Sequence, residues 1–199
     1  MEKEKRELYV ATVSPDDNMK SAIVSLKETG GNRYLLLKVN ETDMNSIISE
    51  FTGVYYPQPL LYSLFAGCLE MLKIQMSRAL IYKIENGRFY AYIYLKVDGA
   101  LIRMDARTSD AVLMAMRMKA PILIYEDVLA AEALRQEGIK DVKTGVMLQP
   151  DTDEFLISDS IELLQKALDK AINMENYELA AQLQREIEKQ QQQKNQAPQ

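Results

Sequence analysis

Histidine is absent from this chain of 199 residues, and there is a single cysteine, Cys68. Without imidazole the chain can form neither a Ser-His or Cys-His nucleophile pair nor an imidazole-ligated zinc site. One cysteine cannot form an internal disulfide, and its apolar neighbours predict a thiol on the buried face of a helix. Acid–base or metal chemistry therefore depends on Asp and Glu, which suit Mg²⁺, Mn²⁺ or Ca²⁺.

Long apolar runs are also lacking. No stretch approaches the roughly 18–20 residues that span a bilayer, and the first ten residues are charged from position 2. We therefore expect no membrane span, no signal peptide and a cytoplasmic protein. A net charge of −5 argues against tight, sequence-independent binding to nucleic acid, although it leaves room for a local basic face.

The first half of the chain predicts strands followed by helices. Residues 7–13, 21–26 and 34–39 have strand-like patterns. A short helix, capped by Thr42 or Asp43, should follow and bury one apolar face. A second helix is predicted over residues 60–74. Its apolar positions are expected to face the core: Leu61, Leu64, Phe65, Cys68, Leu69 and Leu72.

The clearest hairpin signal is Asn86-Gly87, a dipeptide typical of tight turns, between strands at 78–84 and 88–95. Asp98-Gly99 then leads into a strand at 100–104. Three antiparallel strands in a row, with helices before and after, predict an α+β fold with a mainly antiparallel sheet. A parallel doubly wound sheet is disfavoured.

Three tyrosines, Tyr90, Tyr92 and Tyr94, share one face of the strand at 88–95. Two interpretations are open. The row can stack with nucleic-acid bases, or it can form a half-buried sheet face covered by a helix.

The C-terminal part predicts a separate unit. We expect a main domain over residues 1–150, a linker at 151–158, two short helices forming an αα-hairpin at 159–190, and a disordered tail at 191–199. About 35 residues cannot enclose the apolar stripe of this hairpin alone, so it should bind a partner. The partner-binding residues would be Leu164, Leu168, Ala171, Leu179, Ala180 and Leu183.

The strongest candidate site lies where the strand at 100–107 gives way to a helix. Asp105 and Asp110 could hold Mg²⁺ or Mn²⁺, while interleaved arginines clamp phosphate oxygens. The candidate catalytic residues are Asp105, Arg107 and Asp110; the candidate metal ligands are Asp105 and Asp110; and the candidate substrate-binding residues are Arg103, Arg117 and Lys119. Helix capping and ion pairing explain the same residues without catalysis, and they also explain Glu126-Asp127 at the next helix start.

Residues from about Leu8 to Met147 resemble the bifunctional nuclease family. The resemblance is carried by Arg88–Ala91, by Met104–Ala111 (MDARTSDA), by Ala120–Ile122 and by Glu126–Leu129. It implies an α+β fold, nuclease action on DNA and RNA, and an oligomer, most simply a homodimer. Thr108 stands where the family usually has proline. Tyr56–Ser63 replaces a family segment like R-P-x-T-H-D, and this departure favours a non-catalytic protein with the same fold.

The C-terminal hairpin resembles a UVR motif, which joins proteins by pairing hairpins. The resemblance rests on Leu168, Ala171, Ile172 and the run Tyr177–Ala181. Three functions therefore stay open. They are a metal-dependent nuclease, a non-catalytic scaffold that docks partners through the hairpin, and a nucleotide or small-molecule sensor.

Overall fold

The computed structural model of this chain describes residues 3–16, 20–53, 60–137, 161, 164–169, 171–173, 175 and 177–196. The predicted linker at 151–158, and the boundary at residue 150, lie outside the described residues. In the described part, no helix is both long and apolar enough to cross a membrane.

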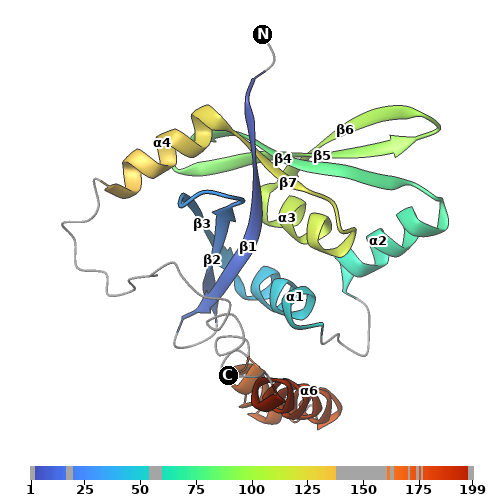
Figure 1. The fold of residues 1–199 in the computed structure, drawn as a ribbon. Helices are drawn as coiled ribbons and strands as arrows, with labels where there is room; N and C mark the ends of the chain where they lie inside the picture. The colour runs from blue at the N-terminus through green and yellow to red at the C-terminus, as the bar shows by residue number, and fades with distance from the viewer. Residues whose placement is uncertain are drawn as a thin grey trace.

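The described strands form one seven-stranded sheet (Figure 1). Its order is β3-β2-β1-β7-β4-β5-β6. Neighbouring strands run antiparallel except β4 and β7, which pair in parallel. The predicted α+β class is therefore confirmed. The strands are β1 (Lys5–Pro15), β2 (Ser21–Glu28), β3 (Tyr34–Asn40), β4 (Gln75–Glu85), β5 (Arg88–Val97), β6 (Ala100–Arg107) and β7 (Ile122–Tyr125).

Helices pack on this sheet in two groups. In Figure 1, α1, α2 and α3 lie on one side of the sheet. Helix α1 contacts β1, β2 and β3, whereas α3 contacts β4, β5 and β6. Helix α2 packs against α3. α4 packs against β3, β4 and β7. The helices are α1 (Glu41–Thr52), α2 (Leu61–Met71), α3 (Thr108–Arg117), α4 (Glu126–Glu137) and, near the C-terminus, α6 (Tyr177–Gln196).

Local sequence signals explain several element boundaries. Asn86 and Gly87 adopt positive φ angles of 50° and 73°, so the predicted β4–β5 turn is confirmed. The cap of α1 differs from the prediction, because Asn40 fills that position and its side chain accepts a hydrogen bond from the Asp43 backbone N–H. Met44, Ile47 and Ile48 are buried, as the helical pattern predicted.

Helix α2 is rotated relative to the prediction. Its buried residues are Ala66 and Leu69, whereas Leu61 is 82% exposed and Leu64 is 55% exposed. Cys68 is also exposed, so the prediction of a buried thiol was wrong. The helix is apolar on more than one side, and among the described residues the side that meets α3 is the one that is covered. Hydrophobic periodicity alone could not select that side.

The row of tyrosines on β5 is not covered by a described helix. Ala91, Ile93 and Leu95, which alternate with the tyrosines, are buried in the core that α3 helps to form, so the tyrosines face the other side of the sheet. Tyr90 is 37% exposed. Tyr92 and Tyr94 are half-buried, as one interpretation of the row predicted, but no helix of the described residues supplies the expected cover. β6 is the edge strand and is largely exposed along its length.

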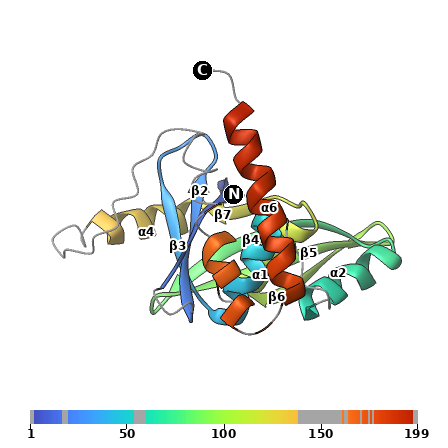
Figure 2. The same cartoon turned by 90° about the horizontal axis from the view of Figure 1, so that it is seen from below.

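The described C-terminal residues form their own apolar cluster. Residues 164–169 and 171–173 are helical, and Glu175 has a positive φ of 56°. Helix α6 comes next in the chain and is the long red helix in Figure 2. α6 continues to Gln196, into the stretch that the sequence predicts as a disordered tail, and its Gln, Lys and Glu residues are good helix formers. The proposed partner-binding residues lie in this cluster or pack against it: Leu164, Ala171, Ala180 and Leu183, with Leu168 and Leu179 at its edge.

Candidate functional site

Arg107 lies at the centre of a polar cluster at the junction of β6, α3 and α1. Its Nε donates to Asp110 Oδ2 at 2.8 Å, and its Nη2 donates to Asp110 Oδ1 at 2.7 Å. The same Nη2 reaches Asp43 Oδ1 at 3.3 Å, while Ser109 Oγ donates to Asp43 Oδ2 at 2.9 Å. One guanidinium therefore joins carboxylates from two helices.

The cluster is open to solvent on the side of Arg107 and Asp110. Their side chains are 62% and 42% exposed, whereas Asp43 is only 13% exposed. The hydrogen bond with Asp110 raises the pKa of Arg107, so the guanidinium stays charged. Asp43 and Ser109 thus form the buried base of the cluster, and Arg107 and Asp110 form its accessible part.

The fold explains why these side chains meet. β6 ends at Arg107, which is the N-cap residue of α3, and Asp110 lies in the first turn, where a carboxylate is favoured by the helix dipole. Asp43 lies in the first turn of α1, which packs against α3. From the sequence, Asp43 is predicted only as a helix cap. No local signal links positions 43 and 107, because only helix packing brings them together.

Asp105 lies apart from this cluster. It is opposite Tyr92 in the β5–β6 register, and its charge contributes to the raised pKa of Tyr82. Within the described residues, no hydrogen bond or ion pair joins Asp105 to Arg107 or Asp110. Of the three predicted catalytic residues, the structure therefore brings two into contact and leaves Asp105 beside the tyrosines.

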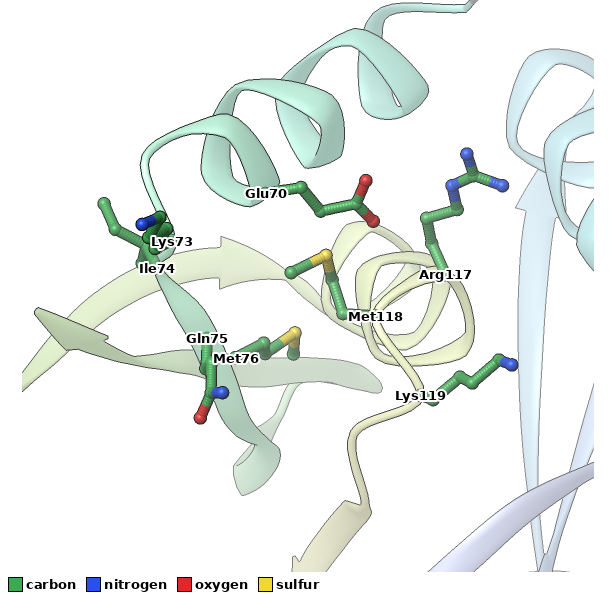
Figure 3. Close-up of a pocket in the computed structure, with 8 residues that line it drawn as sticks. All are labelled: Glu70, Lys73, Ile74, Gln75, Met76, Arg117, Met118 and Lys119. Atoms are coloured by element: carbon green, nitrogen blue, oxygen red, sulfur yellow. The ribbon is translucent and has the colours of Figure 1, made fainter.

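The predicted substrate-binding residues are also separated. Arg103 lies over the ring of Tyr92, 4.4 Å from its centroid. Arg117 and Lys119 lie at the other end of α3, about 10–14 Å along the helix axis from Asp110. They line a cavity of about 520 Å³ together with Glu70, Lys73, Ile74, Gln75, Met76 and Met118 (Figure 3). Arg117 also pairs with Glu50 at 3.6 Å.

The residues present do not form a ready divalent-metal site. The described residues contain no group of three or more acidic or cysteine side chains placed to hold a metal ion. Asp43 and Asp110 alone would satisfy the small number of carboxylates that Mg²⁺ takes from protein. However, the guanidinium of Arg107 already bridges those two carboxylates. A metal ion would have to displace that cation.

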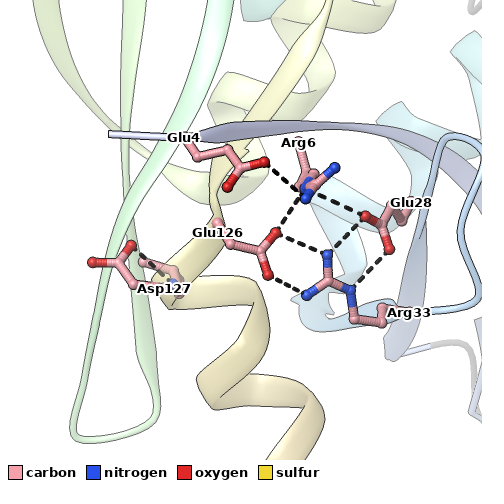
Figure 4. Close-up of polar contacts among 7 residues, drawn as sticks. Glu4, Arg6, Glu28, Arg33, Glu126 and Asp127 are labelled. Carbon is pink, nitrogen blue, oxygen red and sulfur yellow. Dashed lines mark hydrogen bonds and ion pairs between the residues drawn. The ribbon is translucent and has the colours of Figure 1, made fainter. Parts of the chain in front are cut away.

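Glu126 and Asp127 belong to a second polar cluster, which has a structural role. Glu126 accepts from Arg6 at 2.7 Å and from Arg33 at 2.6 Å, and Arg33 in turn pairs with Glu28 at 2.7 Å (Figure 4). Asp127 pairs with Lys3 at 2.7 Å. These ion pairs hold the start of α4 against β1 and the β2–β3 turn. Ion pairing is one of the two non-catalytic roles that the sequence suggests for Glu126 and Asp127.

Comparisons with known proteins place these features in a family. The model of the bifunctional nuclease domain matches residues 24–137, more than half of the chain. An uncharacterized protein of Mycobacterium tuberculosis is 26% identical over 167 residues, covering 82% of this chain and 93% of that protein.

Plant relatives match a shorter stretch. Bifunctional nuclease 1 of Oryza sativa subsp. japonica and a bifunctional nuclease of Oryza minuta are each 26% identical over 106 residues. That stretch is 52% of this chain and 32% of each plant protein. The family match contains Asp43, Arg107, Ser109 and Asp110, together with the whole β4–β6 hairpin region. This chain therefore belongs to the bifunctional nuclease domain family.

Proposed function

We propose that this protein is a nuclease that hydrolyses phosphodiester bonds in DNA, RNA or both, with its reaction centre at Arg107 and Asp110. The main support is the cluster itself, in which an exposed guanidinium is held between two carboxylates inside the family-matched region. Arginine suits phosphate because its planar fork can bind two oxygens at once.

The proposed roles follow from exposure. Arg107 would bind the non-bridging oxygens of the scissile phosphate and stabilise the charge that grows there. Asp110, freed from Arg107 when phosphate binds, would accept a proton from the attacking water. Asp43 would position Arg107 and Ser109 from beneath. Mg²⁺ or Mn²⁺ would add Lewis-acid stabilisation, but the donor set does not form a ready site, and these roles do not depend on the ion.

Nuclease assays on the purified full chain test this proposal. Labelled single- and double-stranded DNA and RNA are incubated with Mg²⁺, with Mn²⁺ or with EDTA. Asp110→Asn should lower the rate by about 10²–10⁴-fold, the usual range for loss of a general base, and Arg107→Gln should be similarly inactive. Asp98→Asn, the same change in an exposed turn, is the matched control and should retain the wild-type rate. Equal activity in all four proteins would indicate a contaminating enzyme.

A second candidate is a non-catalytic binding protein with the same fold. It is favoured by the departure at Tyr56–Ser63, whose residues 56–59 lie outside the described residues, and by the engagement of both carboxylates with Arg107. Binding of oligonucleotides without cleavage under every metal condition would support this candidate over the nuclease.

We also propose that the C-terminal hairpin docks another protein in the manner of a UVR motif. Its buried residues form an apolar cluster distinct from the main core, and Ile172 and Tyr177 remain 49% and 68% exposed. Leu183→Asp puts a charge into that cluster and should unfold the hairpin and abolish docking. The melting temperature of the main domain should hardly change. A large drop in it would mean that the hairpin belongs to the main fold.

A further inference from the structure

Four tyrosines gather on the open face of the β4–β5–β6 sheet. Tyr82 and Tyr92 stack with ring centroids 3.9 Å apart and planes within 5°. Tyr94 meets Tyr92 edge-on at 6.3 Å, and Tyr90 lies 6.3 Å from Tyr82. A hydrogen bond with Tyr92 raises the pKa of Tyr82 from 10 to about 12. We call these four residues the tyrosine platform.

Cations lie on and around the platform. Arg78 is 4.0 Å from the ring centroid of Tyr94, Arg103 is 4.4 Å from that of Tyr92, and Lys83 is 5.5 Å from that of Tyr90. Arg88 and Lys96 alternate with the tyrosines along β5 and therefore share their face. The same surface has fewer carboxylates than cations. The carboxylates are chiefly those of Asp105 and Glu85, and Glu85 forms an ion pair with Lys83 at 2.9 Å. A basic, aromatic face thus occurs on a chain of net charge −5.

The platform also lies beside β6, the strand that ends at Arg107. The β5–β6 register pairs Tyr90 with Arg107, Tyr92 with Asp105 and Tyr94 with Arg103. The row therefore begins beside the strand position of Arg107 and continues along β5, next to the edge strand β6. The side chain of Arg107 itself extends to Asp43 and Asp110, at the starts of α1 and α3.

We propose that the tyrosine platform binds single-stranded nucleic acid, with bases stacked on the exposed ring of Tyr90 and on the guanidinium planes of Arg78 and Arg103, which lie over Tyr94 and Tyr92. The neighbouring cations of the same face would neutralise the phosphates. Aromatic side chains interleaved with cations are what such binding needs, because every base has a π-face and every nucleotide a negative charge. A duplex keeps its bases stacked inside and cannot use the rings. The proposal rests on the proposed function, since it names the strand state of that substrate.

Charge argues against a second copy of this chain as the occupant. A two-fold symmetric contact through the platform would place the same cationic row against itself. That arrangement brings Arg78 and Arg103 close to their own counterparts without enough carboxylates to compensate. A polyanion satisfies the same groups.

The test is binding without cleavage. Fluorescence anisotropy of a labelled oligothymidine of about 12 nucleotides is measured with the full chain in EDTA, beside a blunt duplex of equal length. Tyr92→Leu should weaken single-strand binding at least about tenfold, whereas Tyr92→Phe should stay within about twofold because the ring is kept. Arg103→Gln should weaken binding and flatten its salt dependence. Tyr177→Leu, on the exposed side of α6, is the matched control.

Tyr90→Leu provides a second variant should Tyr92→Leu lower the melting temperature, because Tyr90 is the more exposed ring. The proposal would be overturned by equal binding of the single strand and the duplex, or by unchanged affinity in the leucine variants. It would also be overturned if those variants changed the oligomeric state of the protein but not its affinity for the single strand. Single-strand binding by a protein that cleaves nothing would support the platform while removing the nuclease. If both leucine variants cleave nucleic acid at the wild-type rate, the nuclease proposal would stand and the platform proposal would be removed.

Discussion

Arg107 and Glu126 show how charged residues at similar positions in the fold acquire different roles from their surroundings. Both lie where a strand gives way to a helix, and both form multiple ion pairs. Arg107 is 62% exposed and has one accessible carboxylate partner, so a ligand can compete for it. Glu126 is held by two arginines across three segments of chain, so it serves stability.

The first residue-scale prediction concerns Gly31, which lies against the Glu28 carboxylate. A Cβ at position 31 would overlap the end of the Glu28 side chain. Gly31→Ala should therefore force Glu28 away from Arg33 and lower the free energy of unfolding by about 1–3 kcal/mol, the usual effect of losing charge-assisted hydrogen bonds. Urea denaturation measures this change.

Gly67→Ala is the control for that experiment. An added Cβ at position 67, in α2, meets no atom within 4 Å. This variant should be as stable as the wild type or up to about 1 kcal/mol more stable, because alanine favours helix. If Gly31→Ala unfolds at the wild-type urea concentration, Glu28 has another equally good position.

The second residue-scale prediction concerns pH. Hydrogen bonds from Arg33 and then from Arg6 lower the pKa of Glu126 from 4.5 to about 2. Because the folded-state pKa is depressed, the stabilisation is complete above about pH 5 and is lost as the pH falls towards 2. Glu126→Gln should cost about 1–3 kcal/mol at pH 7 and progressively less below about pH 4.5. Glu178→Gln, on α6, should show no such pH-dependent difference from the wild type.

At the scale of elements, α2 is the least conventional part of the fold. It buries a narrow face on α3 and leaves large apolar side chains exposed at Leu61, Leu64, Met71 and Leu72. The edge strand β6 likewise exposes Leu101, Ile102 and Met104. Exposed apolar area of this extent usually marks a contact surface.

Two leucines on α2 provide a matched test of its orientation. Leu69 is 5% exposed, whereas Leu64 is 55% exposed. Leu69→Ala should lower the free energy of unfolding by about 2–4 kcal/mol because it leaves a cavity. Leu64→Ala should change it by no more than about 0.5 kcal/mol. Equal losses in denaturation experiments would show that both faces of α2 are buried.

At the scale of the whole molecule, the exposed apolar side chains of α2 predict self-association. We expect a homodimer in light scattering at micromolar concentration. Leu72→Lys should shift it towards the monomer without lowering the melting temperature, because Leu72 is 69% exposed and contributes little to the core. Leu134→Lys, at a site on α4 that is 70% exposed, should leave the dimer intact. A wild-type monomer at high micromolar concentration would contradict the prediction.

Local chemistry explains what the sequence alone determined. The individual strands and helices whose order predicts the α+β class, the Asn86-Gly87 turn and the helix start after Arg107 all depend on residues close in the chain. So does the contact of Arg107 with Asp110, which is an i,i+3 pair. Such patterns can be recognised without knowing how the elements pack.

Only the tertiary structure decided which faces and which distant residues meet. Asp43 joins Arg107 because α1 packs on α3, and Asp105 lies among tyrosines because the β5–β6 register pairs it with Tyr92. The side of α2 that is buried depends on its contact with α3, since the helix is apolar on more than one side. Contacts of this kind depend on the packing of whole elements, and hydrophobic periodicity determines only that an element packs, not what it packs against.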